Sequence, residues 1–168
     1  FIKGPMRRSD FLEMTPELQP LSWNDLNFLS TTGHEIGSHS MNHSRLSEQR
    51  TEGDLVDEIV SPADFLEKKL GRKTDWFAYP FGDITSIDPQ SLQMIGRRYQ
   101  YCCSGLRGIN TGSTHRLCLT REEINLDQPL DYLKQIITGG LDFYYFLKRR
   151  KLSQMVNRGN PGSDGDIS

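Results

Sequence analysis

Hydrophobic residues recur at helical spacing in several stretches of the chain, and short apolar runs separate those stretches. The spacing predicts helices over residues 22–33, 51–71, 88–96 and 130–147. The first three helices begin at residues whose side chains can cap an N-terminus, namely Ser22, Thr51 and Asp88. Pro62 interrupts the second helix, so we expect a kink there.

The short apolar runs predict β-strands at residues 1–4, 34–39, 76–79, 99–104 and 117–119. Strands that alternate with helices are typical of βαβ units, so the sequence predicts an α/β fold with a sheet or barrel of mostly parallel strands. Functional residues of such folds lie at the carboxyl ends of the strands. His39 and the pair Pro80-Phe81 follow two of the predicted strands in this way.

The length of 168 residues suits one domain, which we assign to residues 1–152. The polar residues 153–168 are predicted to form a disordered tail. The chain opens at Phe1, without an initiator Met, on residues that read as the end of a strand. We therefore expect the domain to lack its first βα unit, and the sequence does not indicate a compartment.

Charge and composition exclude some classes of partner. The net charge of −2 and the isoelectric point near 6.1 leave no broad cationic surface of the kind that nucleic-acid binding needs. No apolar run approaches the roughly 18 residues of a transmembrane helix, and no signal peptide is visible. Three cysteines without C-x-x-C spacing predict buried thiols, not a disulfide framework or a cysteine zinc site: Cys102, Cys103 and Cys118. The oligomeric state stays open.

The most informative segment for chemistry is His39-Ser40-Met41-Asn42-His43. Imidazoles four residues apart can bind one metal ion if the intervening turn is helical, and neutral imidazole nitrogens suit zinc and neighbouring transition metals. Two exposed loop histidines that bind nothing would have the same spacing. The pair therefore predicts a divalent metal site, most readily for zinc, with the loop alternative left open.

Two motifs resemble those of the metal-dependent polysaccharide deacetylases, a family of NodB-like carbohydrate esterases. The run from Gly33 to His43 is similar to the family's second motif, G-H-E-I-x-x-H-[ST]-x-x-H, and Trp76 to Gly82 looks like its third motif. In order and spacing the resemblance covers roughly residues 1–125. It implies a distorted barrel of parallel strands and the removal of acetyl groups from N-acetylated sugars in a polysaccharide or oligosaccharide.

The resemblance also implies roles for individual residues. His39 and His43 match the two metal-ligand histidines, and the backbone N–H of Phe81 matches a donor to the oxyanion. Tyr79 is a second catalytic candidate, with packing in the core as the alternative. The implied substrate-binding residues are Pro80, Phe81 and Arg121. For the last of these, an ordinary solvated charge run is an equally good explanation.

The sequence departs from the family pattern at two other motifs. The first motif, T-F-D-D, supplies a catalytic base and a third metal ligand, and no Asp-Asp pair occurs in this chain. The late L-x-H motif, which supplies a general acid, has no match either, since His115 lies in a polar loop without the leucine. Two other functions therefore stay open. One is a noncatalytic carbohydrate-binding or scaffold protein, and the other is a metal-binding regulatory or amidohydrolase-like module that uses His39 and His43 with carboxylates such as Asp75 or Asp83.

Overall fold

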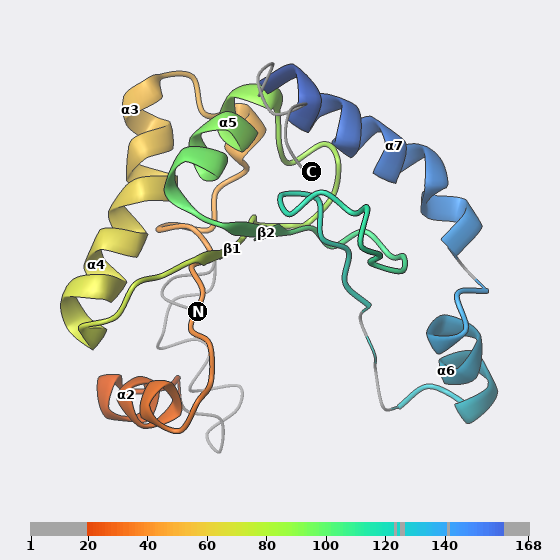
Figure 1. The fold of residues 1–168 in the computed structure, drawn as a ribbon, viewed down its shortest axis with the longest axis horizontal. Helices are drawn as coiled ribbons and strands as arrows, with labels where there is room; N and C mark the ends of the chain where they lie inside the picture. The colour runs from red at the N-terminus through yellow and green to blue at the C-terminus, as the bar shows by residue number, and fades with distance from the viewer. Residues whose placement is uncertain (1–19, 123, 125–126, 141, 160–168) are drawn as a thin grey trace, which may run out of the picture.

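The computed structural model of the chain describes residues 20–122, 124, 127–140 and 142–159 (Figure 1). The strand predicted at residues 1–4 lies outside this part. Two short strands lie at the centre of the molecule, and the helices are arranged around them (Figure 1). Helices and parallel strands together confirm the α/β class predicted from the sequence.

The sheet consists of β1 (Trp76–Ala78) and β2 (Tyr101–Cys103), which run parallel with Phe77 opposite Cys102. One further segment joins each side through a single parallel bridge, from Ser38 to Phe77 and from Leu119 to Cys103. Four parallel segments therefore lie side by side at the centre of the fold, and the candidate site residues follow three of them.

The predicted barrel is not formed by the residues that the structure describes, whose only sheet has two strands. The segments predicted as strands at 34–39 and 117–119 are reduced to one bridging residue each. On the first of these, Ser38 exchanges backbone hydrogen bonds with Trp76 and Ala78. Ser40 then turns into the left-handed region, with φ of 63°, which ends the extended conformation.

The helix predicted at 51–71 is present as three joined pieces: α3 (Glu52–Leu55), the π-turn η2 (Val56–Val60) and α4 (Ser61–Leu70). Thr51 caps its beginning through a capping box, and Gly71 ends it with φ of 66°. Pro62 lies in the first turn of α4, and because it has no N–H it cannot donate to the preceding turn of the same continuous helix. The departure from regular α-helix therefore falls just before Pro62, as a π-turn.

Helix α5 (Pro89–Arg98) connects β1 to β2 and begins where the sequence predicted. The carboxylate of Asp88 accepts a hydrogen bond of 2.8 Å from the backbone N–H of Ser91, and proline follows at the first helical position. Leu92 and Ile95 on its inner face are buried.

Replacing Asp88 with alanine removes this cap, so we expect the free energy of unfolding to fall by about 1 kcal/mol. Urea unfolding followed by circular dichroism measures the change. The control is Gln90→Ala in the same helix, an exposed position that caps nothing. Equal stability of the Asp88 variant and the control would contradict the assignment.

The single helix predicted at 130–147 is two helices, α6 (Leu130–Ile137) and α7 (Asp142–Gly159). Gly139, with φ of 76°, lies at the break between them. Helix α7 also continues past residue 153, where the tail was predicted to start. Leu152 and Val156 are buried on α7, which packs against α5, and this apolar contact extends the helix beyond the point that polar composition indicated.

The core contains the inward-facing residues of the sheet and of the helices around it, including Phe77, Tyr79, Leu92, Ile95 and Leu152. All three cysteines are free thiols, and Cys102 and Cys118 are buried as predicted, whereas Cys103 is half-buried. Burial raises the pKa of the Cys102 thiol well above its usual range. Cys102 and Cys118 therefore behave as apolar core residues.

Helix α2 (Trp23–Thr31) packs against α4 through an edge-to-face contact between Trp23 and Phe65, with ring centroids 5.5 Å apart. The Lys69 ammonium lies 5.6 Å from the centroid of the Trp23 ring.

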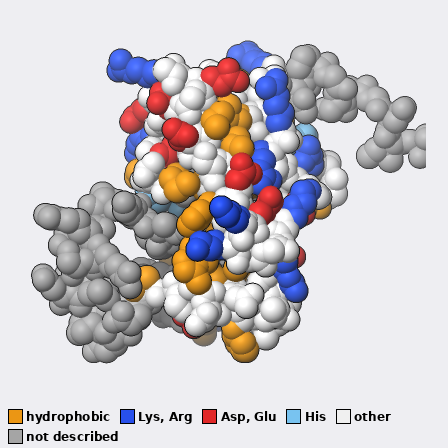
Figure 2. Space-filling model, turned by 90° about the vertical axis from the view of Figure 1, so that its left-hand side faces the viewer, with side chains coloured by type: hydrophobic (Ala, Val, Ile, Leu, Met, Phe, Trp, Pro, Cys, Tyr) orange, Lys and Arg blue, Asp and Glu red, His pale blue; other side chains and the backbone are white. Residues whose placement is uncertain are grey.

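On the face seen in Figure 2, hydrophobic side chains lie between basic and acidic ones. Within the described ranges, no helix combines the length and the hydropathy needed to cross a membrane.

Candidate active site

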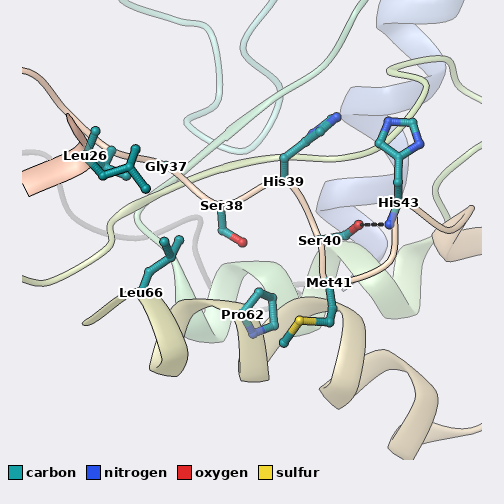
Figure 3. Close-up of a pocket in the computed structure, with 10 residues that line it drawn as sticks. Leu26, Gly37, Ser38, His39, Ser40, Met41, His43, Pro62 and Leu66 are labelled. Atoms are coloured by element: carbon teal, nitrogen blue, oxygen red, sulfur yellow. Dashed lines mark hydrogen bonds between the residues drawn. The ribbon is translucent and has the colours of Figure 1, made fainter. Parts of the chain in front are cut away.

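The two histidines of the H-x-x-x-H segment lie on one loop directly after the bridging residue Ser38. Their ring centroids are 4.9 Å apart, and the rings meet edge to face. Figure 3 shows both side chains projecting from the same side of the loop, away from Met41 and Pro62. The structure thus brings together the two predicted metal ligands.

The sequence predicted that both histidines could bind one metal ion if the turn between them was helical, but the turn in the structure is not helical. Ser40 and His43 both adopt left-handed backbone conformations, with φ of 63° and 60°. The backbone N–H of His43 donates a hydrogen bond of 2.9 Å to the Ser40 hydroxyl, which closes the loop (Figure 3). Left-handed backbone is disfavoured for such residues and concentrates at functional sites.

His39 is half-buried, and its Nδ1 lies 2.6 Å from the backbone oxygen of Ala78 at the end of β1. Because a carbonyl oxygen only accepts, Nδ1 carries the proton, and Nε2 keeps the lone pair that a metal ion needs. Burial lowers the pKa of His39, although the hydrogen bond to Ala78 acts in the opposite direction. The neutral imidazole, which is the form that binds metals, is therefore favoured.

Phe81 lies against the second histidine. Its ring meets the His43 ring edge to face at 4.9 Å, and the Arg45 guanidinium lies 4.2 Å from its centroid. The Arg45 side chain is held by a hydrogen bond of 2.7 Å to the Ser86 hydroxyl. Phe81 itself has φ of 63°, and 52% of its surface is exposed. The turn that carries its backbone N–H, the predicted oxyanion donor, therefore adjoins the histidine pair.

Tyr79 and Pro80, from the same motif, are buried in the core. The Tyr79 hydroxyl donates a hydrogen bond of 3.0 Å to the backbone oxygen of Gly82, and burial raises the pKa of this phenol. The Tyr79 side chain packs in the core, which was the alternative given for it, and this burial keeps its hydroxyl from a substrate. The Pro80 ring is buried as well, so of the three residues Tyr79, Pro80 and Phe81 only Phe81 is exposed enough to contact a substrate.

Arg121 is exposed, and it reaches the site from the far edge of the sheet. Its Nε donates a hydrogen bond of 2.8 Å to the backbone oxygen of Ser104. Together with His39, Trp76 and Cys103 it lines a cavity of about 260 Å³. A second hollow of about 110 Å³ is lined by His39 and His43 together with Pro62 and Leu66 (Figure 3). The predicted substrate contact by Arg121 is therefore compatible with its position beside the first histidine.

The two aspartates considered as further metal ligands, Asp75 and Asp83, both form ion pairs with lysines. Asp75 pairs with Lys73 at 2.7 Å, and Asp83 pairs with Lys148 at 2.8 Å. The hydrogen bond from Lys148 lowers the pKa of Asp83. No group of three or more metal-binding side chains occurs in the described part of the chain. Neither aspartate joins the histidines, so the structure does not support the metal-binding module built on Asp75 or Asp83.

One residue of the site was missed from the sequence. Glu58 is 5% exposed and accepts hydrogen bonds from Asn42 and Ser44, both on the histidine loop. The available signal was its position three residues after Leu55, on the helix face that also carries Ile59. An acidic residue on a buried helix face requires donors, and these come from the loop.

Comparison with known proteins gives the family. The polysaccharide deacetylase family model matches residues 9–99, which is more than half of the chain. The chain therefore belongs to the polysaccharide deacetylase family, as its motifs indicated.

The chain is also similar to individual proteins and solved structures. The chain is 37% identical over 70 residues to the uncharacterized protein YlxY of Bacillus subtilis (strain 168), a match over 40% of this chain and 22% of that protein. The fold is similar to that of the Streptococcus pyogenes deacetylase PplD, solved in complex with acetate, with a TM-score of 0.60 and 24% identity over 74% of this chain and 54% of that one.

A polysaccharide deacetylase from Bacillus cereus, BC0361, gives a TM-score of 0.59 with 21% identity. The match covers 72% of this chain and 38% of that one. The chain thus spans about half or less of the length of these relatives.

Proposed function

We propose that this chain supplies the histidine ligands of a metal-dependent hydrolase that removes N-acetyl groups from a polysaccharide or oligosaccharide. The observation that carries the proposal is the histidine pair, whose rings lie 4.9 Å apart with the Nδ1 of His39 directed at the backbone oxygen of Ala78. A metal-ligating histidine usually donates its second nitrogen in this way.

The residues present fit part of a zinc site. His39 and His43 offer two nitrogen ligands, and zinc sites of hydrolases usually contain three protein ligands. By the family pattern, the third ligand and the general base are the aspartates of the T-F-D-D motif, which this sequence does not contain. Zinc bound there would supply Lewis-acid activation of the acetyl carbonyl and of the attacking water.

The chain's own residues supply positioning and charge stabilisation around that reaction. The backbone N–H of Phe81 is proposed to donate to the carbonyl oxygen as negative charge develops on it. The exposed Phe81 ring offers an apolar surface for a sugar ring, and Arg121 offers hydrogen-bond donors at the cavity beside His39. The four parallel segments at the centre are proposed to be part of the distorted barrel of the family.

The second candidate function is noncatalytic carbohydrate binding, and one observation favours it. Without an Asp-Asp pair, the sequence contains neither the family's catalytic base nor its third metal ligand. The same exposed ring and cavity would then bind a sugar without cleaving its amide bond.

Acetate release separates the two functions. The catalytic function predicts that the protein, supplied with zinc chloride, releases acetate from N-acetylated chitin or peptidoglycan oligosaccharides and loses this activity in EDTA. Enzymatic acetate detection measures the release, and isothermal titration calorimetry measures binding of the same sugars. Binding without acetate release would support the noncatalytic function, and a protein that neither binds nor cleaves these sugars would contradict both.

A further inference from the structure

Glu58 connects the helical layer to the histidine loop. It lies in the π-turn η2, and its carboxylate accepts hydrogen bonds of 3.1 Å from the backbone N–H of Asn42 and 2.8 Å from the amide of the same residue. A third bond of 3.2 Å comes from the Ser44 hydroxyl. These donors flank His43 on both sides in the sequence, so one carboxylate holds both neighbours of the second histidine.

The electrostatics favour the ionised form of this carboxylate. Burial raises the pKa of Glu58, but the hydrogen bonds from Asn42, Ser44 and Ser40 outweigh this effect and lower the pKa below its ordinary value. A buried carboxylate is costly unless it is hydrogen-bonded, and the loop supplies those bonds. In return, the loop segment 40–44 is held against a helix that belongs to the core.

The loop needs such a restraint because of its backbone. Ser40 and His43 both lie in the left-handed region, which residues with a Cβ atom rarely adopt. Such conformations persist only where the surroundings over-determine them. On the far side of the loop, the 3-10 turn η1 (Leu46–Glu48) is anchored by buried Leu46, whose backbone N–H donates to Ser86. Between Ser40 and this 3-10 turn, Glu58 bonds the two residues next to His43.

We propose that Glu58 is the positioning residue of the metal site, whose carboxylate holds the loop so that the His43 ring stays beside the His39 ring. The metal part of this inference rests on the proposed function. The positioning part concerns the metal-free protein as well. Glu58 accepts from the Asn42 backbone and from the Asn42 and Ser44 side chains, so it acts by holding the two loop residues next to His43.

The test compares Glu58→Gln with Asp57→Asn. Both substitutions remove one carboxylate charge from the same π-turn, but Asp57 is exposed, whereas Glu58 is buried. Glutamine keeps the shape of glutamate and loses one acceptor and the charge. We expect Glu58→Gln to weaken zinc binding, measured by competition with a chromophoric chelator, by about tenfold or more. Asp57→Asn is expected to match the parent.

Hydrogen exchange of the metal-free protein provides a second readout. We expect the amides of Asn42 and His43 to exchange faster in Glu58→Gln than in the parent, at an unchanged midpoint of global unfolding. If Glu58→Gln does not fold, Ser44→Ala removes a single donor and tests the same contact. Parental zinc affinity together with parental exchange at Asn42 would overturn the proposal. A parent protein that binds no zinc would overturn the proposed metal function, and the exchange rates would then decide the positioning role alone.

Discussion

Alanine in place of either His39 or His43 is expected to weaken zinc binding by at least about 100-fold. Loss of a group that only orients a ligand usually costs 10- to 100-fold in metal affinity, and these substitutions remove a ligand itself. The two rings lie 4.9 Å apart, so either variant would leave a single imidazole at the site. Zinc titration by isothermal calorimetry measures the loss.

The matched control is His34→Ala. His34 belongs to the same motif, but it is exposed and lies just after α2, where its Nδ1 contacts the Thr32 hydroxyl. We expect this variant to bind zinc as the parent does. If both loop variants bind zinc as tightly as the parent, the histidine pair is not the metal site, and the alternative of two ordinary loop histidines stands.

Local signals in the sequence predicted much of the helical structure. The caps at Ser22, Thr51 and Asp88 are all present, because a cap depends on residues within one turn. The strand at Trp76–Ala78 was also predicted, from an apolar run bounded by proline and glycine. These features are decided by neighbours along the chain, so a single sequence contains them.

The features that the sequence did not predict depend on contacts between distant segments. Helix α7 continues past residue 153 because Leu152 and Val156 are buried where it packs against α5, a contact that polar composition does not show. Glu58 enters the site because its donors lie 14 to 16 residues away on another element. The histidine spacing predicted a metal pair, but the left-handed turn that brings the rings together is visible only in the fold.

Gly82 is the second position where we expect a large effect, and here the effect is on stability. It follows the Phe81 turn with φ of 64°, and a Cβ atom there would lie 2.6 Å from both the Cα and the N of Gly105. The two glycines are also joined by a hydrogen bond of 2.9 Å from Gly105 N–H to Gly82 oxygen, and the Tyr79 hydroxyl donates to the same oxygen. The segments that follow β1 and β2 therefore meet backbone to backbone.

Replacing Gly82 with alanine is expected to lower the free energy of unfolding by about 2 to 5 kcal/mol. About 1 to 2 kcal/mol comes from the left-handed conformation, and about 1 to 3 kcal/mol comes from overpacking against a backbone that has no flexible side chain to move. Gly33→Ala separates these two causes, since Gly33 has φ of 95° but nothing within 4 Å of the added Cβ. Urea unfolding should show the smaller cost for Gly33→Ala and the full cost for Gly82→Ala. Equal costs would mean that the close approach to Gly105 contributes nothing, and that the Phe81 turn is held by its backbone conformation alone.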